Sequence, residues 1–295
     1  MATPDISSAQ PPLPAINTLW NFGDVTATRN KFLELLPQAQ ASGDKSYYLQ
    51  LLTQLARTHS LQNNFDEAHK ILDTVEKQLN PDLKVARVRY LLERGRCYNS
   101  SNQQERSIPY FMEAVDIAHS INETRLEVDA IHMVAIAKSD PKDQVEWNLK
   151  GIERATATSE KGWLHALYNN IGESYLRLKE YDNAYKYFHL LAELQKEQSG
   201  ESDIYTLKDE AKALTLGGKP QEALVILEPV SKKLTESNEE NGWIENEVAE
   251  ALYALNRKGK AQPHFKKAYE LLSKDDYCIK YEPERLEHLK TMAEQ

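Results

Sequence analysis

Residues 165–194 read HALYNNIGESYLRLKEYDNAYKYFHLLAEL, and small and aromatic side chains recur there at helical spacing. Small residues stand at Gly172 and Ala184, and aromatic residues stand at Tyr168, Tyr175 and Phe188. Side chains three or four positions apart lie on one face of a helix. A small residue lets two helix backbones approach, and an aromatic ring fills the space beside it. The stretch therefore predicts two packed helices rather than a catalytic site.

The Ala184-x3-Phe188 pattern repeats along the chain. Its first member stands at intervals of 39, 38, 39, 39 and 38 residues, at Ala68, Ser107, Val145, Ala184, Ala223 and Ala261. Four residues later a large apolar residue follows each time, at Leu72, Phe111, Leu149, Phe188, Leu227 and Phe265. Three further on the residue is again apolar: Val75, Ala114, Ile152, Leu191, Val230 and Ala268. This regularity predicts six repeated units of 38–39 residues.

A second helix is predicted upstream of each anchor. In the second unit it carries Leu91, Gly95 and Tyr98, at positions like those of Tyr168, Gly172 and Tyr175 in the fourth. Short polar turns such as residues 62–64 and 216–218 separate the two helices. Each unit is therefore expected to be a helix–turn–helix pair.

These residues resemble the tetratricopeptide repeat family, whose pattern is aromatic-x2-Leu-Gly-x2-Tyr followed by Ala-x3-Phe. Tyr168, Ile171, Gly172, Tyr175, Ala184 and Phe188 match that pattern. The period is longer than the family's usual ~34 residues, and Pro81 is the nearest match to the family's late proline. The resemblance implies an all-α fold, a right-handed α-α superhelical solenoid of about six repeats.

The expected domain organisation has a repeat array between two caps. We expect a mostly disordered lead-in over residues 1–23, with an apolar staple near residues 19–22. A capping helix is expected over 24–44, the repeats over 45–275 and a C-terminal capping helix over 276–295. The third unit is the weakest, because its turn at residues 139–142 is about two residues short.

Composition restricts the compartment and the partners. The net charge of −9 disfavours binding to nucleic acid. The N-terminus has no secretory signal and no apolar run could span a membrane. Cys97 and Cys278 lie far apart and are expected to be thiols in a reducing compartment. We therefore expect a cytoplasmic protein that binds neither membranes nor nucleic acid.

No catalytic or metal motif stands out in the sequence. It contains no His-Glu-x-x-His, no Cys-x-x-Cys and no Gly-x-Ser-x-Gly. Residues 216–219, Leu-Gly-Gly-Lys, lack the spacing and the Ser or Thr of a phosphate loop and fall where a turn is due. We expect no cofactor and no metal.

The phase of the repeats instead places polar side chains on the first helix of each unit, along the groove of such a solenoid. The candidate groove residues are Arg57, Arg89, Arg96, Asp129, His132, Asn169, Asn170, Glu173, Lys208, Asn246 and Glu250. Arg89 and Arg96, two helical turns apart, could hold an acidic side chain or a terminal carboxylate. The carboxamides of Asn169 and Asn170 could grip a peptide backbone in either direction, or Asn170 could bond to a neighbouring helix.

Several functions remain open on these residues. The leading hypothesis is a scaffold or adaptor that binds an extended peptide or a helix in the groove. The alternative is an enzyme in which His132 acts as a general base beside Asp129 or Glu173. A third hypothesis is a peptide-sensing regulatory receptor, as in bacterial repeat receptors; the 23 residues before the first helix are too few for a DNA-binding module.

One known ligand of such repeats is disfavoured. The repeats that clamp the C-terminal Glu-Glu-Val-Asp of chaperones use Lys and Asn, then Asn, then Lys and Arg. The matching positions here hold Thr53 and Arg57, then Glu93, then Asp129 and Met133. A chaperone tail is therefore not expected to bind by the usual carboxylate clamp.

Overall fold

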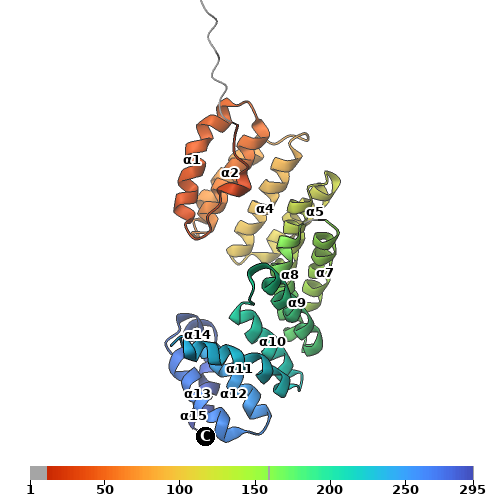
Figure 1. Cartoon of the computed structure of the whole chain (residues 1–295). Coiled ribbons are helices and arrows are strands. Elements are labelled where there is room, and N and C mark those ends of the chain that lie inside the picture. The colour runs from red at the N-terminus through yellow and green to blue at the C-terminus, as the bar shows by residue number, and fades with distance from the viewer. Residues whose placement is uncertain (1–11, 159, 295) are drawn as a thin grey trace, which may run out of the picture. The chain divides into compact units, whose positions relative to one another are not determined.

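A computed structural model describes residues 12–158 and 160–294. Over these residues the chain forms helices and no strand (Figure 1). In chain order the elements are η1 (Ile16–Leu19), α1 (Val25–Ala41), α2 (Lys45–Ser60), α3 (Phe65–Glu76), α4 (Lys84–Ser100), α5 (Gln104–Ser120), α6 (Thr124–Ala137), α7 (Pro141–Ala157), η2 (Lys161–Trp163), α8 (Leu164–Arg177), α9 (Tyr181–Ser199), α10 (Ile204–Leu216), α11 (Pro220–Glu236), α12 (Gly242–Ala254), α13 (Lys258–Leu272), α14 (Asp276–Tyr281) and α15 (Pro283–Glu294).

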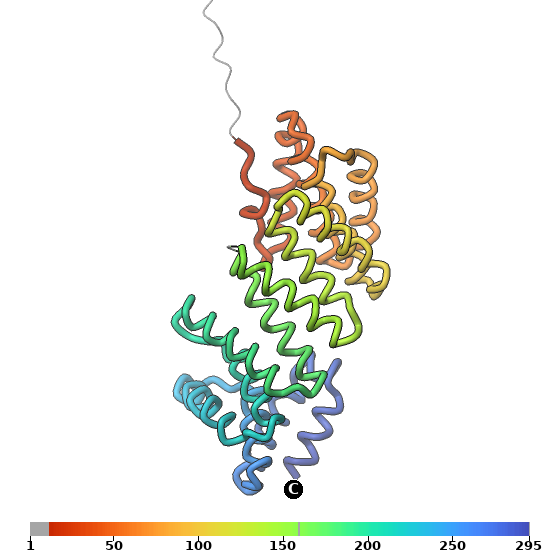
Figure 2. Tube along the Cα trace, turned by 90° about the vertical axis from the view of Figure 1, so that its right-hand side faces the viewer, coloured from red at the N-terminus to blue at the C-terminus, as the bar shows by residue number. Residues whose placement is uncertain are grey.

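The chain divides into two compact units, and the boundary falls between Lys138 and Ser139. The first unit contains α1 to α6, and the second contains α7 to α15. Within each unit successive helices pack side by side, as the trace in Figure 2 shows. The boundary lies at the short turn of the third unit, the unit that matched the repeat pattern least well in the sequence.

Five of the six predicted pairs pack as pairs within the units: α2–α3, α4–α5, α8–α9, α10–α11 and α12–α13. The predicted third pair is divided by the boundary, because α6 belongs to the first unit and α7 to the second. We call the first helix of each predicted pair the A helix and the second the B helix. The close approach expected from the opening stretch is confirmed, since a Cβ built on Gly172 would lie 2.6 Å from Phe188 Cε1. Gly95 and Phe111 repeat this contact in the second pair. No larger residue fits at either glycine unless the ring moves.

The turns within the pairs share one backbone conformation. Asn63, Asn102, Lys179, Gly218 and Asn256 all have positive φ, between 57° and 79°. Each follows an A helix by a few residues and reverses the chain into the B helix. Asparagine and glycine tolerate this left-handed region, whereas a lysine is strained there. Lys179 is thus a local weak point in the fourth pair.

Lys179→Gly is expected to raise the free energy of unfolding by about 0.5–1 kcal/mol, because it removes the strain of a Cβ at positive φ. Urea denaturation followed by circular dichroism measures the change. Lys179→Ala is the control: it removes the same charge but keeps the Cβ, so it should leave stability within about 0.5 kcal/mol. Equal effects of the two substitutions would contradict the strain.

The predicted phase of the third pair is wrong by one residue. Leu149, expected in the core, is 41% exposed, whereas Asn148 is 1% exposed. Ala155 is buried on the same face of α7, seven residues beyond Asn148. Asn148 can lie inside because its Nδ2 donates a hydrogen bond to the Gln144 carbonyl at 2.8 Å. Val145 and Leu149 match the repeat pattern in the sequence, but the buried face of α7 is formed by Asn148, Gly151 and Ala155 instead.

Additional helices precede α2 and follow α13. The Asp24 side chain caps α1 by accepting from the Ala27 N–H, and Phe32 of α1 is fully buried. At the other end the helix predicted over 276–295 is divided into α14 and α15, and α15 packs on α13. Residues 1–11 of the predicted lead-in lie outside the described residues, and residues 16–19 form η1. The domain boundaries themselves stay predictions.

Candidate functional site: the A-helix faces

The A helices of the first unit present a row of polar side chains. Gln50 and Arg89 are one repeat length of 39 residues apart and are hydrogen-bonded at 2.9 Å. Gln54 and Glu93 are separated by the same interval, and Gln54 Nε2 donates to Glu93 Oε1 at 3.2 Å. Because the same helical position recurs in each repeat, these side chains line up across α2 and α4. We call this surface the first A-helix face: Gln50, Gln54 and Arg57 of α2, Arg89, Glu93 and Arg96 of α4, and Asp129 and His132 of α6.

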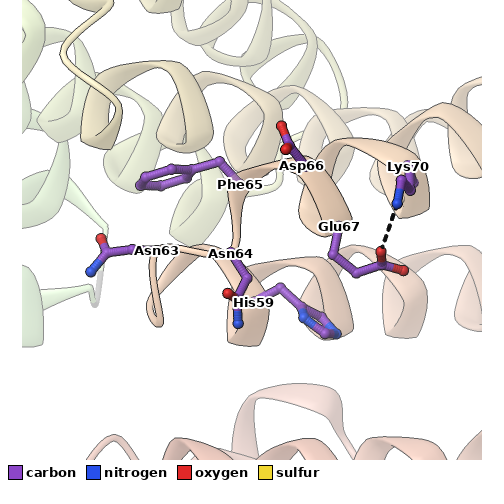
Figure 3. A pocket seen from close by; sticks show the side chains of 7 residues that line it. All are labelled: His59, Asn63, Asn64, Phe65, Asp66, Glu67 and Lys70. Carbon is purple, nitrogen blue, oxygen red and sulfur yellow. Dashed lines mark hydrogen bonds and ion pairs between the residues drawn. The ribbon is translucent and has the colours of Figure 1, made fainter.

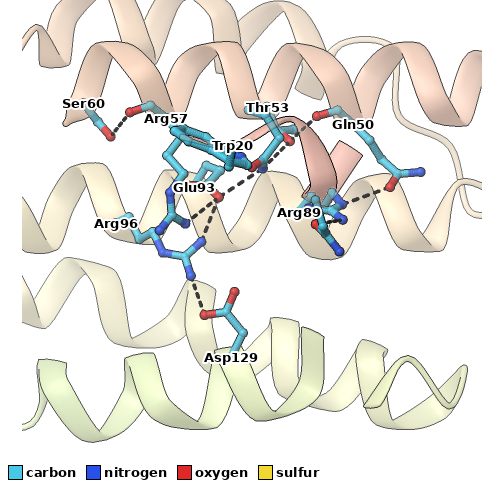
Figure 4. Close-up of polar contacts among 11 residues, drawn as sticks. Trp20, Gln50, Thr53, Arg57, Ser60, Arg89, Glu93, Arg96 and Asp129 are labelled. Atoms are coloured by element: carbon cyan, nitrogen blue, oxygen red, sulfur yellow. Dashed lines mark hydrogen bonds and ion pairs between the residues drawn. The ribbon is translucent and has the colours of Figure 1, made fainter. Parts of the chain in front are cut away.

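Glu93 is the centre of this face (Figure 4). Its Oε1 accepts from Arg57 NH1 at 3.2 Å and from Arg96 NH1 at 2.7 Å. Its side chain is only 3% exposed. A buried carboxylate is tolerated when it is paired and hydrogen-bonded, and here two guanidinium groups neutralise it. The arrangement ties α2 to α4 by charge.

Arg96 extends the pairing to α6, where its NH2 donates to Asp129 Oδ1 (Figure 4). Burial alone would raise the pKa of Asp129, but the charges of Arg96 and Arg57 outweigh it and hold the pKa below its ordinary value. Burial lowers the pKa of His132 from 6.5, and the Asp129 charge offsets this only in part. The His132 ring is therefore neutral at pH 7, beside a carboxylate that Arg96 binds. A neutral imidazole is the form in which a general base acts, so the enzyme alternative stays a hypothesis.

Asp129→Asn is expected to lower the free energy of unfolding at pH 7 by about 1.5–3 kcal/mol, the range of a hydrogen bond to a charged group. Because the folded pKa of Asp129 is depressed, its contribution is present above the unfolded pKa and is lost as the pH falls through the folded one. The difference from wild type should therefore shrink below about pH 4. Urea denaturation at pH steps from about 7 to 3 tests this. Asp116→Asn, an exposed site on α5, is the control, and a difference that stays constant with pH would contradict the assignment.

A segment ahead of α1 lies against the same face. Arg89 NH2 donates to Asn17 Oδ1 at 2.9 Å, and Trp20 Nε1 donates to Gln54 Oε1 at 2.9 Å. The Arg57 guanidinium carbon lies 5.6 Å from the centres of both the Trp20 and Phe22 rings. The sequence predicted apolar stapling by this segment but not its polar contacts with the arginines.

The second unit holds the other six candidates, Asn169, Asn170, Glu173, Lys208, Asn246 and Glu250, on the A helices α8, α10 and α12. Lys208 Nζ lies 2.9 Å from Asp209 Oδ1 and 5.5 Å from the centre of the Trp243 ring. Desolvation, with the nearby Asp209 charge, raises the pKa of Glu173. We call these six residues the second A-helix face.

Asn246 and Glu250 are, like Lys208, engaged within their own unit. Asn246 is 2% exposed and its Nδ2 donates to Glu247 Oε1 at 2.8 Å. Glu250 Oε1 lies 2.7 Å from His288 Nε2 of α15. A partner can therefore reach Glu250 more easily than Asn246, whose carboxamide orients a buried carboxylate. Asn169 and Asn170 are half-buried on α8.

Sequence reasoning missed Gln54 and Glu93 as members of the first face. One signal was available, because Gln54, Glu93 and His132 follow each other at 39-residue intervals. The pairing of Arg96 with Asp129, 33 residues apart, had no such signal. It depends on how α4 and α6 pack.

A separate cavity of about 490 Å³ lies at the α2–α3 turn and is shown in Figure 3. His59, Asn63, Phe65 and Glu67 are among its lining residues. Burial, with the nearby Arg29 charge, lowers the pKa of His59. In the second unit a cleft of about 860 Å³ lies between α11 and α13. Neither cavity includes a predicted groove residue.

Two further features concern ions and membranes. Within residues 12–158 and 160–294, no group of three or more His, Cys, Asp or Glu side chains is placed to hold a metal ion. The same part of the chain has no helix with the length and apolar character needed to cross a membrane.

Paired antiparallel helices with a small-residue contact define a helical-repeat protein, and comparisons with known proteins name the repeat. The model of the tetratricopeptide repeat family matches residues 88–119 and 165–198, which are the pairs α4–α5 and α8–α9. No curated protein sequence is significantly similar to the chain. The α4–α5 and α8–α9 pairs are thus similar to tetratricopeptide repeats, and the chain has the predicted all-α, tetratricopeptide-like fold of helix pairs.

Three solved structures illustrate the likeness. A Pyrococcus horikoshii STAND protein with a tetratricopeptide repeat sensor is 14% identical, with a TM-score of 0.68; the match covers 90% of this chain and 42% of that one. Putative kinesin light chain repeats from Podosopora anserina are 18% identical, with a TM-score of 0.56; the match covers 64% of this chain and 95% of that one. A Rap protein complexed with competence and sporulation factor is 17% identical, with a TM-score of 0.53 and coverage of 95% and 84%. At these identities the likeness shows the fold alone.

Proposed function

We propose that the protein is a protein-interaction adaptor that binds a segment of a partner protein along its A-helix faces. One observation carries the proposal: the first face already holds a stretch of polypeptide, residues 14–22. Tyr47 Oη donates to the main-chain oxygen of Pro14 at 2.8 Å, and Arg89 donates to the carboxamide of Asn17. Side chains of two successive repeats are thus placed to hold a segment of polypeptide.

The ion pairs of the first face favour such binding. Glu93 and Asp129 fix the Arg96 guanidinium, and Glu93 also fixes Arg57. Groups that are already fixed lose little conformational entropy when a partner binds. Affinity at such surfaces usually depends on a few residues, often arginine and aromatic side chains.

The fold and the cysteines add support. The Rap structure named above has a related fold and contains a bound factor. Cys97 and Cys278 are both buried thiols, which suits the reducing cytosol in which we place the adaptor. The proposed partner is a protein or peptide, with no nucleic acid involved.

The test is affinity capture from the source cells with three forms of the protein, read by mass spectrometry. The first variant carries Arg89→Ala and His132→Ala, and the second carries Glu173→Ala and Lys208→Ala. The control carries Met112→Ala and Leu190→Ala, two exposed apolar residues on B helices. A partner bound by the A-helix faces should be retained by the control and should lose about tenfold in affinity with at least one face variant.

Purified partner and titration calorimetry then give the dissociation constants. If every captured protein binds the wild type, both face variants and the control with equal affinity, the A-helix faces are not the binding surface. A partner lost only with the B-helix control would place binding on the opposite side.

A further inference from the structure

Residues 14–22, which we call the strap, make several kinds of contact with the first A-helix face. Carboxamide, main-chain and indole groups of the strap are hydrogen-bonded to Arg89, Tyr47 and Gln54. The Trp20 and Phe22 rings are stacked at 4.8 Å, with the Arg57 guanidinium near both. These contacts come from helices α2 and α4, so the strap lies across the first two A helices.

The strap buries fewer side chains than the helices beneath it. Ile16 is its one buried residue, and Phe22 is 63% exposed. Its regular structure is the four-residue 3-10 helix η1. Segments with few buried apolar contacts open locally at a small fraction of the global unfolding free energy. The strap can therefore leave the face while α2 and α4 stay folded.

The surface under the strap is specific in its chemistry. Arg89 donates a hydrogen bond to a carboxamide oxygen, and Gln54 accepts one from an indole N–H. The Arg57 guanidinium makes cation–π contacts with two aromatic rings. A guanidinium over an aromatic face is attracted by the ring's electrons. The strap residues that supply these groups follow the order Asn17, Trp20 and Phe22. A segment with Asn-x-x-Trp-x-Phe could make the same contacts.

We propose that the strap is a built-in occupant of this surface, and that a partner segment with the Asn-x-x-Trp-x-Phe pattern displaces it. The inference rests on the proposed adaptor function and names the partner chemistry for the first face. The strap lowers the apparent affinity for such a segment by the fraction of time that it covers the face. Because it is tethered, its effective concentration is high, and a partner must compete with it.

Trp20 also contacts the protein core. Its ring lies 5.3 Å from that of Phe32 in an edge-on arrangement, and Phe32 is fully buried. The closed strap therefore stabilises α1 as well as covering the face. Because of this contact, Trp20→Ala is expected to release the strap from the face and also to lower the free energy of unfolding.

The experiment measures binding of a labelled synthetic peptide, PLPAINTLWNFG (residues 12–23), to the full chain by fluorescence anisotropy. Wild-type protein should bind it weakly. The Asn17→Ala/Trp20→Ala variant should bind it about tenfold more tightly, because its own strap no longer competes. A peptide in which the tryptophan and phenylalanine are alanine is the control and should not bind. Adding Arg57→Ala and Arg89→Ala to the variant should abolish the gain.

A second variant keeps the test decisive if loss of Trp20 disturbs folding. Asn17→Ala/Phe22→Ala changes two exposed side chains and leaves Trp20 in place, so helicity and melting should match wild type. It should bind the peptide a few-fold more tightly. If neither folded variant binds the peptide more tightly than wild type, the proposal is wrong. Dimers detected by light scattering would also contradict it, because they would show that the strap is exchanged between two chains. If only the second-face variant, Glu173→Ala/Lys208→Ala, loses the captured partner, the strap proposal is wrong. The adaptor function would then still hold, because the partner would bind the second A-helix face.

Discussion

Replacing Phe188 with alanine is expected to lower the free energy of unfolding by about 3–5 kcal/mol, the range for removing a buried aromatic side chain. The ring is fully buried between α8 and α9, and it fills the space that Gly172 leaves. Urea denaturation followed by circular dichroism measures the loss. Leu190→Ala, two residues further along α9 and 38% exposed, is the matched control and should cost below about 1 kcal/mol.

A double substitution tests the contact itself. Gly172→Ala alone should destabilise the protein, because the added Cβ would stand 2.6 Å from Phe188 Cε1. In the Phe188→Ala background that clash is gone, and alanine favours the helix over glycine by about 1 kcal/mol. The sign of the Gly172→Ala effect should therefore reverse. The same cost in both backgrounds would show that Gly172 and Phe188 do not limit each other's size.

The fourth pair could be predicted because its signal is local. Gly172 and Phe188 belong to adjacent helices, and helical periodicity places both on facing sides. The third pair could not, because Asn148 is buried through a hydrogen bond to its own helix backbone. Periodicity counts an asparagine as exposed and Leu149 as buried, and here both assignments are reversed. A polar residue that is hydrogen-bonded to its own helix backbone gives no apolar signal.

The candidate site was predictable as a set of positions and not as a set of contacts. The repeat phase identified Arg89 and Arg96 as residues of one A-helix face. It did not identify what each guanidinium binds, since Asn17 lies 72 residues before Arg89 and Asp129 lies 33 residues after Arg96. Such partners depend on the packing of helices and on the path of the chain ahead of α1. Arg96 was therefore expected to hold an acidic ligand, whereas Glu93 and Asp129 of the same chain occupy it.

Glu93→Ala is expected to destabilise the protein by about 3–5 kcal/mol, because it leaves Arg57 and Arg96 close together without the carboxylate that separates their charges. Glu93 is the shared acceptor of both guanidinium groups and of Gln54. Urea denaturation of the full chain gives the change. Glu93→Gln keeps the shape and one acceptor oxygen, so its cost should be smaller.

Glu113 provides the matched control for burial. Its Oε1 accepts from Arg87 NH2 at 2.5 Å, a pairing as close as those of Glu93, yet its side chain is 43% exposed. Solvent screens an exposed pair, so Glu113→Ala should cost below about 1 kcal/mol. Combining Glu93→Ala with Arg57→Ala should cost less than the sum of the two single losses, because the unpaired charge is removed with its partner. If the two glutamate substitutions have equal effects, the first A-helix face is not held together by its buried carboxylate, and the guanidinium groups are not fixed in advance for a partner.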